Sequence, residues 1–135
     1  MRDRKMLSIF FISLFALLMI GCATTPTRQE FETADYGPYP EKYEESIKAH
    51  YYPRLLDPYS AMYYFYKPVK AWNRLENVFG WATCGTINAK NRMGGYTGAK
   101  PFYFLFKNNQ IVTYYDSDPA FVGGICQGSG AYQAR

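Results

Sequence analysis

The sequence predicts an α+β fold in which one N-terminal helix packs on a small antiparallel sheet of three to four strands. Apolar residues recur at every fourth position within 40–52, which is typical of a helix with one buried stripe. Later segments are rich in aromatic and β-branched residues, as strands are, and turn-forming residues separate them. One helix followed by antiparallel strands gives a two-layer domain.

The helix is predicted over residues 40–52. Pro40 suits a first helical turn, where its missing N–H costs no hydrogen bond. Tyr43, Ile47 and Tyr51 form the apolar stripe. Pro53 disfavours continuation of the helix beyond the residue before it.

The strands are predicted over 61–66, 81–89, 102–106 and 111–113, and the last two flank Lys107-Asn108-Asn109-Gln110 as a hairpin, because asparagine tolerates positive φ. Residues 55–60 are expected to form a short turn that packs two leucines, and 68–80 an irregular connection or a weak edge strand. After Asp116 the chain turns glycine-rich, and only a few positions are expected to be held in place: Phe121, Val122, Ile125 and Cys126.

An apolar run ends at a cysteine near the start of the chain. A basic head at residues 2–5 precedes the run over 6–20, and small Gly21 stands directly before Cys22. The run is shorter than the roughly 20 residues that a membrane-spanning helix needs. The pattern resembles the signal peptide of a bacterial lipoprotein, which is cleaved before a cysteine that then carries acyl chains. The alternative is cleavage without lipidation.

Lipidation at Cys22 would make the lipid bilayer a partner of the protein, because two or more acyl chains anchor stably. Ala23 rather than aspartate follows Cys22, which by resemblance favours the outer membrane, facing the periplasm. The chain then divides into a signal peptide (1–21), a lipidated cysteine with a flexible tether (22–39) and a single small α+β domain (40–135). As a coil, the tether would span about 23 Å root-mean-square.

The charge of the chain does not indicate nucleic acid as a partner. The formal net charge is +4, but three basic residues and one acidic residue fall within the predicted signal peptide, which leaves +2 for the mature chain. No basic cluster of nucleic-acid-binding character follows. All 14 tyrosines lie in the mature chain, which favours half-exposed aromatic surfaces.

Two cysteines, Cys84 and Cys126, remain in the mature chain besides Cys22. An even pair in an oxidising compartment predicts a disulfide, which would contribute up to about 4 kcal/mol by closing a loop of about 40 residues. Two unpaired thiols are the alternative.

Several short motifs follow one another in a distinctive order: Asp-Tyr-Gly-Pro-Tyr-Pro at 35–40, Leu-Asp-Pro-Tyr-Ser-Ala at 56–61, Gly80-Trp81 with Cys84, Asn-Ala-Lys-Asn-x-x-Gly-Gly-Tyr-Thr-Gly at 88–98, and Lys100-Pro101-Phe102. This order resembles a family of small, uncharacterised lipoproteins of Gram-negative bacteria. The resemblance covers about residues 34–112 and implies a lipid-anchored envelope protein, but no reaction.

One glycine-rich segment, residues 88–98, is the candidate binding loop. Lys90, Asn91, Arg92 and Tyr96 supply donors and a ring suited to an anion or a sugar. The segment lacks the residue order of a nucleotide-binding loop. The alternative is a hairpin loop that needs glycine for positive φ.

Other candidate sites are weaker. Cys84 with His50 would be a thiol and its base, but no third orienting residue is evident. Asp116 and Asp118 lack the further ligands of a calcium loop and suit a solvated turn. The aromatic run 63–66 is either a platform for a partner or for sugar rings, or a set of cross-strand pairs. No cofactor and no metal site is expected.

The expected role is therefore binding rather than catalysis. The leading hypothesis is an accessory or structural envelope lipoprotein that contacts an envelope protein or peptidoglycan. The alternative is a small periplasmic inhibitor or ligand-binding protein that acts through the glycine-rich loop. A thiol-dependent enzyme is a third, weaker alternative.

Overall fold

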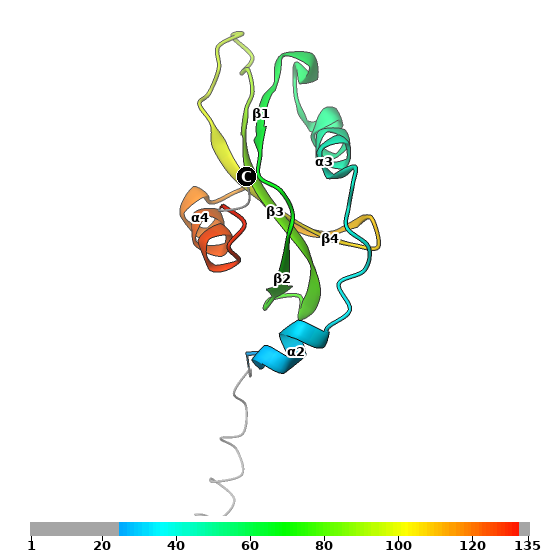
Figure 1. Ribbon diagram of the computed structural model, residues 1–135. Helices are drawn as coiled ribbons and strands as arrows, with labels where there is room; N and C mark the ends of the chain where they lie inside the picture. Colours follow the sequence, from blue (N-terminus) through cyan, green and yellow to red (C-terminus); the bar gives the residue numbers. More distant parts are fainter. Residues whose placement is uncertain (1–24, 133–135) are drawn as a thin grey trace, which may run out of the picture.

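The computed structural model describes residues 25–132 of the 135-residue chain. Within this range a five-stranded antiparallel sheet lies between two helices (Figure 1). The strands are β1 (Met62–Phe65), β2 (Val69–Asn73), β3 (Val78–Asn88), β4 (Lys100–Lys107) and β5 (Gln110–Tyr115). The α-helices are α2 (Arg28–Thr33), α3 (Tyr43–Tyr51) and α4 (Pro119–Gly128), and two 3-10 turns, η2 (Tyr52–Arg54) and η3 (Pro58–Ser60), precede β1.

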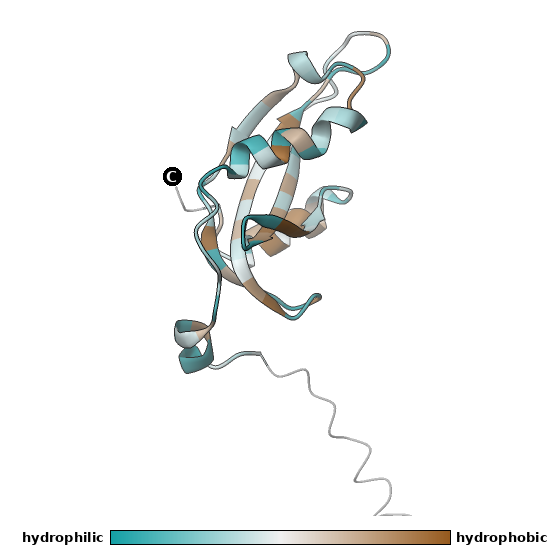
Figure 2. Ribbon diagram, turned by 90° about the vertical axis from the view of Figure 1, so that its right-hand side faces the viewer, coloured by the Kyte–Doolittle hydropathy of each residue, from teal (hydrophilic) through white to brown (hydrophobic). Residues whose placement is uncertain are grey.

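The predicted fold class, one N-terminal helix on three to four strands, is wrong. The sheet has five strands, α2 precedes the helix that the apolar stripe identifies, and α4 covers the opposite face of the sheet from α3 (Figures 1 and 2). The structure is therefore mostly a five-stranded antiparallel sheet, with a short helix from the middle of the chain and another helix near its C-terminal end.

The sequence does not predict helix α4, because Gly123 and Gly124 stand at its centre and glycine is a poor helix former. Its N-terminus nevertheless carries two favourable features. The Asp118 carboxylate accepts hydrogen bonds from the backbone N–H groups of Ala120 and Phe121, at 2.9 and 3.2 Å. Pro119 follows in the first turn, where it is well tolerated.

Strand β3 pairs with three other strands. β4 lies along one side of it, and β1 and β2 share the other side, opposite 85–88 and 78–82 respectively. The chain leaves the sheet between them at Lys67-Pro68, where proline cannot donate a ladder hydrogen bond. The segment 68–80, expected to be irregular or a weak edge strand, thus contains the edge strand β2.

Alternating residues of β4 build two cores. Phe102, Phe104 and Phe106 pack beneath α3 with Ile47 and Tyr51. Tyr103 and Leu105 point to the other face, where they pack with the two cysteines and with Val122 of α4. Figure 2, seen from the side of α3, shows this helix lying across the sheet, with α4 behind it.

The range 22–39, predicted to be a flexible tether, has regular structure in its described part. Thr27 and Glu30 form a capping box at the start of α2, with hydrogen bonds of 2.7 and 3.2 Å. Tyr36 is only 4% exposed. The Trp81 Nε1 donates a hydrogen bond to the Gly37 carbonyl oxygen at 3.0 Å. The chain is therefore packed on the sheet well before residue 40.

The predicted signal peptide (1–21) and the predicted lipid attachment site, Cys22, lie outside the described residues. Between residues 25 and 132, none of the helices has the length and apolar character that crossing a membrane requires.

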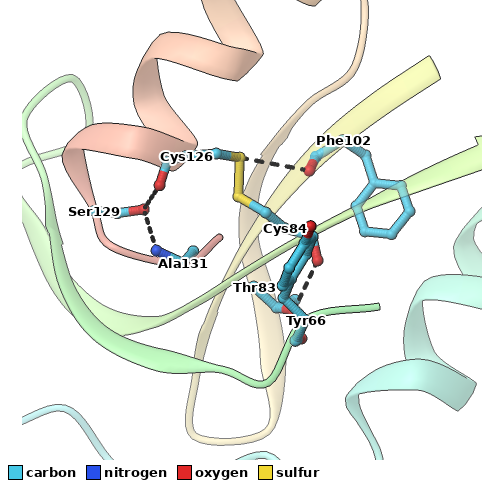
Figure 3. Close-up of a disulfide and its surroundings, with 7 residues drawn as sticks. All are labelled: Tyr66, Thr83, Cys84, Phe102, Cys126, Ser129 and Ala131. Carbon is cyan, nitrogen blue, oxygen red and sulfur yellow. Dashed lines mark hydrogen bonds between the residues drawn. A yellow bond between two sulfur atoms is a disulfide. The ribbon is translucent and has the colours of Figure 1, made fainter. Parts of the chain in front are cut away.

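The predicted disulfide between Cys84 and Cys126 is present and links β3 to α4 (Figure 3). Both cysteines are fully buried in the core on the α4 face. Ser129 Oγ donates a hydrogen bond to the Cys126 carbonyl oxygen at 3.1 Å, just after the last turn of the helix. The disulfide thus links the glycine-rich helix α4 to the central strand β3.

We expect the Cys84→Ala/Cys126→Ala variant to unfold at a temperature lower by several degrees or more. Closing a loop with a sequence separation of 42 contributes about 4 kcal/mol in the loop-entropy model, which is large for a domain of this size. Differential scanning calorimetry with and without reductant measures the effect, and reductant should leave the double variant unchanged. Two freely alkylated thiols in the native, unreduced protein would contradict the prediction.

Candidate functional site

The end of the molecule opposite α2 is built from two segments that are far apart in sequence. One is the turn from α3 to β1, containing η2 and η3, and the other is the loop from β3 to β4 (Figure 1). The Tyr96 hydroxyl donates a hydrogen bond to the Ser60 carbonyl oxygen at 3.0 Å. The Lys90 Nζ lies 3.7 Å from the Asp57 carboxylate. These contacts hold the two segments together.

The candidate loop is organised by Asn91. Its side-chain oxygen accepts hydrogen bonds from the backbone N–H groups of Met93 and Gly95, at 2.9 and 3.1 Å. Lys90 and Tyr96 form a β-bridge across the base of the loop. Gly94 and Gly98 have φ values of 80° and 95°, which favour glycine. The glycines thus serve the turn, as the hairpin-loop alternative requires, and a binding role for the segment stays a prediction.

The four predicted loop residues have different surroundings. The Lys90 Nζ lies 5.5 Å from the centre of the Tyr96 ring, within cation–π range. Both side chains also contact the turn at 57–60. Asn91 is committed to the backbone of the loop. Arg92 is exposed at its tip. The structure therefore brings the four residues together, but gives three of them internal contacts.

The Asp57 carboxylate and the Lys90 ammonium lie at the junction of the two segments. Hydrogen bonding from Ser60, together with the positive charge of Lys90, lowers the pKa of Asp57. The carboxylate also accepts the Ser60 backbone N–H at 3.3 Å and so caps η3. The charged pair thus has a structural role at this end of the molecule.

Exposed apolar side chains surround this junction and were not predicted as a group. We call them the distal surface, and their exposed fractions are 52% for Tyr52, 66% for Leu56, 86% for Tyr59, 51% for Met62, 92% for Met93 and 45% for Tyr96. Tyrosine and methionine are enriched in protein interfaces. Leu56 was expected to pack in the turn, and the run of Pro58, Tyr59 and Ser60 was the available indication that the turn faces solvent.

The aromatic run 63–66 is divided between the two faces of the sheet. Tyr63 and Phe65 stack on each other with ring centres 5.5 Å apart beneath α3. On the other face Tyr66 contacts Tyr132, at 5.3 Å, while Tyr64 is 50% exposed. Most of the run therefore serves packing, and it does not form one platform.

His50 and Cys84 lie on opposite faces of the sheet. His50 lies in the last turn of α3 and packs against the rings of Phe104 and Tyr114, at 5.1 and 4.2 Å, and burial lowers its pKa. Cys84 lies on the α4 face in the disulfide. The geometry does not join them as a nucleophile and a base.

The two aspartates near the C-terminal end are also separated in role. Asp116 accepts a hydrogen bond from the Tyr51 hydroxyl at 3.1 Å, and burial together with this carboxylate raises the pKa of Tyr51. Asp118 caps α4. Within residues 25–132 no group of three or more histidine, cysteine, aspartate or glutamate side chains is placed to hold a metal ion.

Comparisons of the chain with protein-family models, with curated proteins and with solved structures give no match. The candidate site is accordingly defined by its own geometry: an exposed apolar surface supported by one hydrogen bond and one ion pair between two segments.

The two adjacent glycines of the loop tip should differ in their tolerance of alanine. Gly94 has φ 80°, whereas Gly95 lies outside the left-handed region and an added Cβ would meet only the Asn91 side chain, at 3.8 Å. We expect Gly94→Ala to lower the free energy of unfolding by about 1 kcal/mol or more, and Gly95→Ala to leave it unchanged or slightly raise it. Chemical denaturation of both variants measures this, and equal losses would contradict the loop conformation.

Proposed function

We propose that this protein is an envelope lipoprotein, anchored to the outer membrane through acylated Cys22, and that it acts by binding an envelope protein or peptidoglycan. The anchor is supported by the basic head, the short apolar run and Gly21 directly before Cys22. The distal surface is the part that would meet the partner.

One observation carries the proposal of a binding role. The distal surface exposes several large apolar side chains at the end of the molecule opposite α2, the first described helix after Cys22 (Figure 1). Burying such side chains stabilises a complex by about 25 cal/mol per Å² of apolar surface. In the isolated domain these side chains stay in contact with water and contribute no such stabilisation. Large exposed apolar patches mark interaction sites.

The geometry of the described residues does not support the thiol-dependent enzyme. Cys84 is held in the disulfide on one face of the sheet and His50 is packed on the other. The polar contacts at the junction beside the distal surface, Lys90 with Asp57 and Tyr96 with Ser60, hold the two segments together.

A specific observation favours inhibition of a wall-degrading enzyme as a second candidate function. The β3–β4 loop projects beyond the sheet (Figure 1) and carries Met93, 92% exposed, next to exposed Arg92. A projecting loop with a fixed base suits insertion into the cleft of another protein. Inhibition of a muramidase by the wild-type protein, lost in the Arg92→Ala/Met93→Ser variant, would favour this candidate over a structural role.

The anchor is tested by metabolic labelling with palmitate. We expect the wild-type protein to take up label and to sediment with membranes. The Cys22→Ser variant should take up no label, and once its signal peptide is removed it should no longer sediment with membranes. A wild-type protein that takes up no label would refute anchoring by acylation.

The binding role is tested by two leucines that are equally exposed at opposite ends. Leu56 of the distal surface and Leu75 of the β2–β3 hairpin are each 66% exposed. We expect Leu56→Ser/Tyr59→Ser to weaken cross-linking to the partner in detergent-solubilised envelopes, or cosedimentation with purified peptidoglycan, by at least about tenfold. That factor corresponds to about 1.4 kcal/mol.

The Leu75→Ser variant is the matched control and should capture the partner like the wild type. Thermal melting of both variants separates lost binding from lost folding. Equal capture by Leu56→Ser/Tyr59→Ser and the wild type would refute the distal surface as the binding site.

A further inference from the structure

A second apolar surface lies at the opposite end of the molecule, where the described chain begins. A groove of about 520 Å³ runs between β2, α4 and the residues before α2. Such a volume is within the range of about 300–1,000 Å³ typical of ligand-binding pockets. Its lining includes Thr25, Pro26, Trp72, Leu75, Phe121 and Ile125.

Large apolar side chains at the rim of this groove are open to solvent. Leu75 is 66%, Phe121 45% and Phe31 37% exposed. Trp72 is partly exposed, and its Nε1 donates a hydrogen bond to the Asn77 side chain at 3.2 Å. We call Phe31, Trp72, Leu75 and Phe121 the proximal surface. Amphipathic tryptophan rings of this kind suit the boundary between lipid and water.

The short sequence distance from Cys22 to the groove indicates that the lipid bilayer is the partner of this surface. Thr25, which lines the groove, is three residues after Cys22, and three residues of chain span at most about 11 Å. Each headgroup layer of a bilayer is about 5–8 Å thick, as the difference between its total and hydrocarbon thickness shows. A chain acylated at Cys22 therefore reaches only a few ångströms beyond the headgroups before it enters the groove.

We propose that the proximal surface rests in the headgroup region of the membrane in which Cys22 is anchored. This inference rests on the proposed lipidation. The short connection after Cys22 keeps the domain close to the membrane, because residues from Phe31 onward already pack on the sheet and add no free length. Apolar side chains held at that distance gain by entering the lipid boundary, as interfacial helices do to a depth of about 5–10 Å.

The charges around this surface balance, so burial of apolar side chains rather than attraction to anionic lipid drives the contact. Basic and acidic side chains on α2, the β2–β3 hairpin and the adjoining pocket rims are equal in number: Arg28, Lys70, Arg74 and Lys107 against Glu30, Glu32, Asp35 and Glu76. The contact should therefore persist in about 1 M salt, where the Debye length is about 3 Å.

The test uses the full-length lipidated protein in vesicles of phosphatidylethanolamine and phosphatidylglycerol that carry a fluorescence quencher at the headgroup or deep in the acyl chain. Trp72 and Trp81 are the two tryptophans of the chain. In a Trp72→Phe/Trp81→Phe background, a single reporter is placed by Leu75→Trp or by Leu56→Trp, two positions that are each 66% exposed. The Trp81→Phe variant, which keeps native Trp72 as reporter, covers the case in which the background folds poorly.

We expect headgroup quencher to reduce the fluorescence of Leu75→Trp and of native Trp72 severalfold more than that of Leu56→Trp, with the deep quencher less effective and high salt without effect. Equal quenching of Leu75→Trp and Leu56→Trp, or no quenching of either, in protein that is labelled with palmitate and bound to vesicles would overturn this inference while the proposed anchor stands. Protein that takes up no palmitate would overturn both.

Discussion

The fold depends on the pairing of β3 with three other strands. Its eleven residues extend about 35 Å, which is enough to pair with β1 near one end, with β2 near the other and with β4 along most of its length. The same strand carries Cys84 toward α4 and Trp81 toward the Gly37 carbonyl oxygen. A side chain at Gly85 would overlap the Tyr64 carbonyl oxygen and the Phe102 ring, so this position keeps β1 and β4 close to the central strand.

The long axis set by β3 separates two exposed apolar surfaces with different supports. The distal surface stands on two segments joined by a hydrogen bond and an ion pair. The proximal surface stands on β2, α4 and α2, which are fixed by the disulfide and by the packing of Tyr36 on Phe79 and Trp81. If the chain is anchored as we propose, the proximal surface faces the lipid and the distal surface is directed away from it. The rigid sheet between them then fixes the direction in which the distal surface points from the membrane.

Local sequence patterns were sufficient for the elements whose determinants are close together in the chain. The i, i+4 stripe identified α3, the Asn108-Asn109 turn identified the β4–β5 hairpin, and both asparagines do take positive φ. Helix α4 was missed because its stability comes from a disulfide and from burial of Val122, which oppose the low helix propensity of its glycines. Helix α2 was missed because its range is polar, although Thr27 and Glu30 have the spacing of a capping box.

The candidate loop was visible in sequence because glycine and asparagine are concentrated in it. The rest of the distal surface was not visible in the sequence. The exposure of Tyr52, Leu56 and Tyr59 follows from the way in which the turn before β1 contacts the β3–β4 loop. Leucine and tyrosine occur in cores and on surfaces alike, and only the tertiary arrangement decides between them.

The interruption of the sheet edge at Lys67-Pro68 also bears on self-association. An uninterrupted edge strand beside β3 would present a long row of free N–H and C=O groups, which is a template for pairing with a second molecule. Here the edge is divided into β1 and β2, of four and five residues, and Thr83 Oγ1 donates a hydrogen bond to the Tyr66 carbonyl oxygen at 2.6 Å next to the break. At the opposite edge, the register shift between Leu105 and Phe106 disturbs the β4–β5 ladder. A chain with this many aromatic side chains in its strands thereby offers short, irregular edges to its neighbours, which protects it from aggregation.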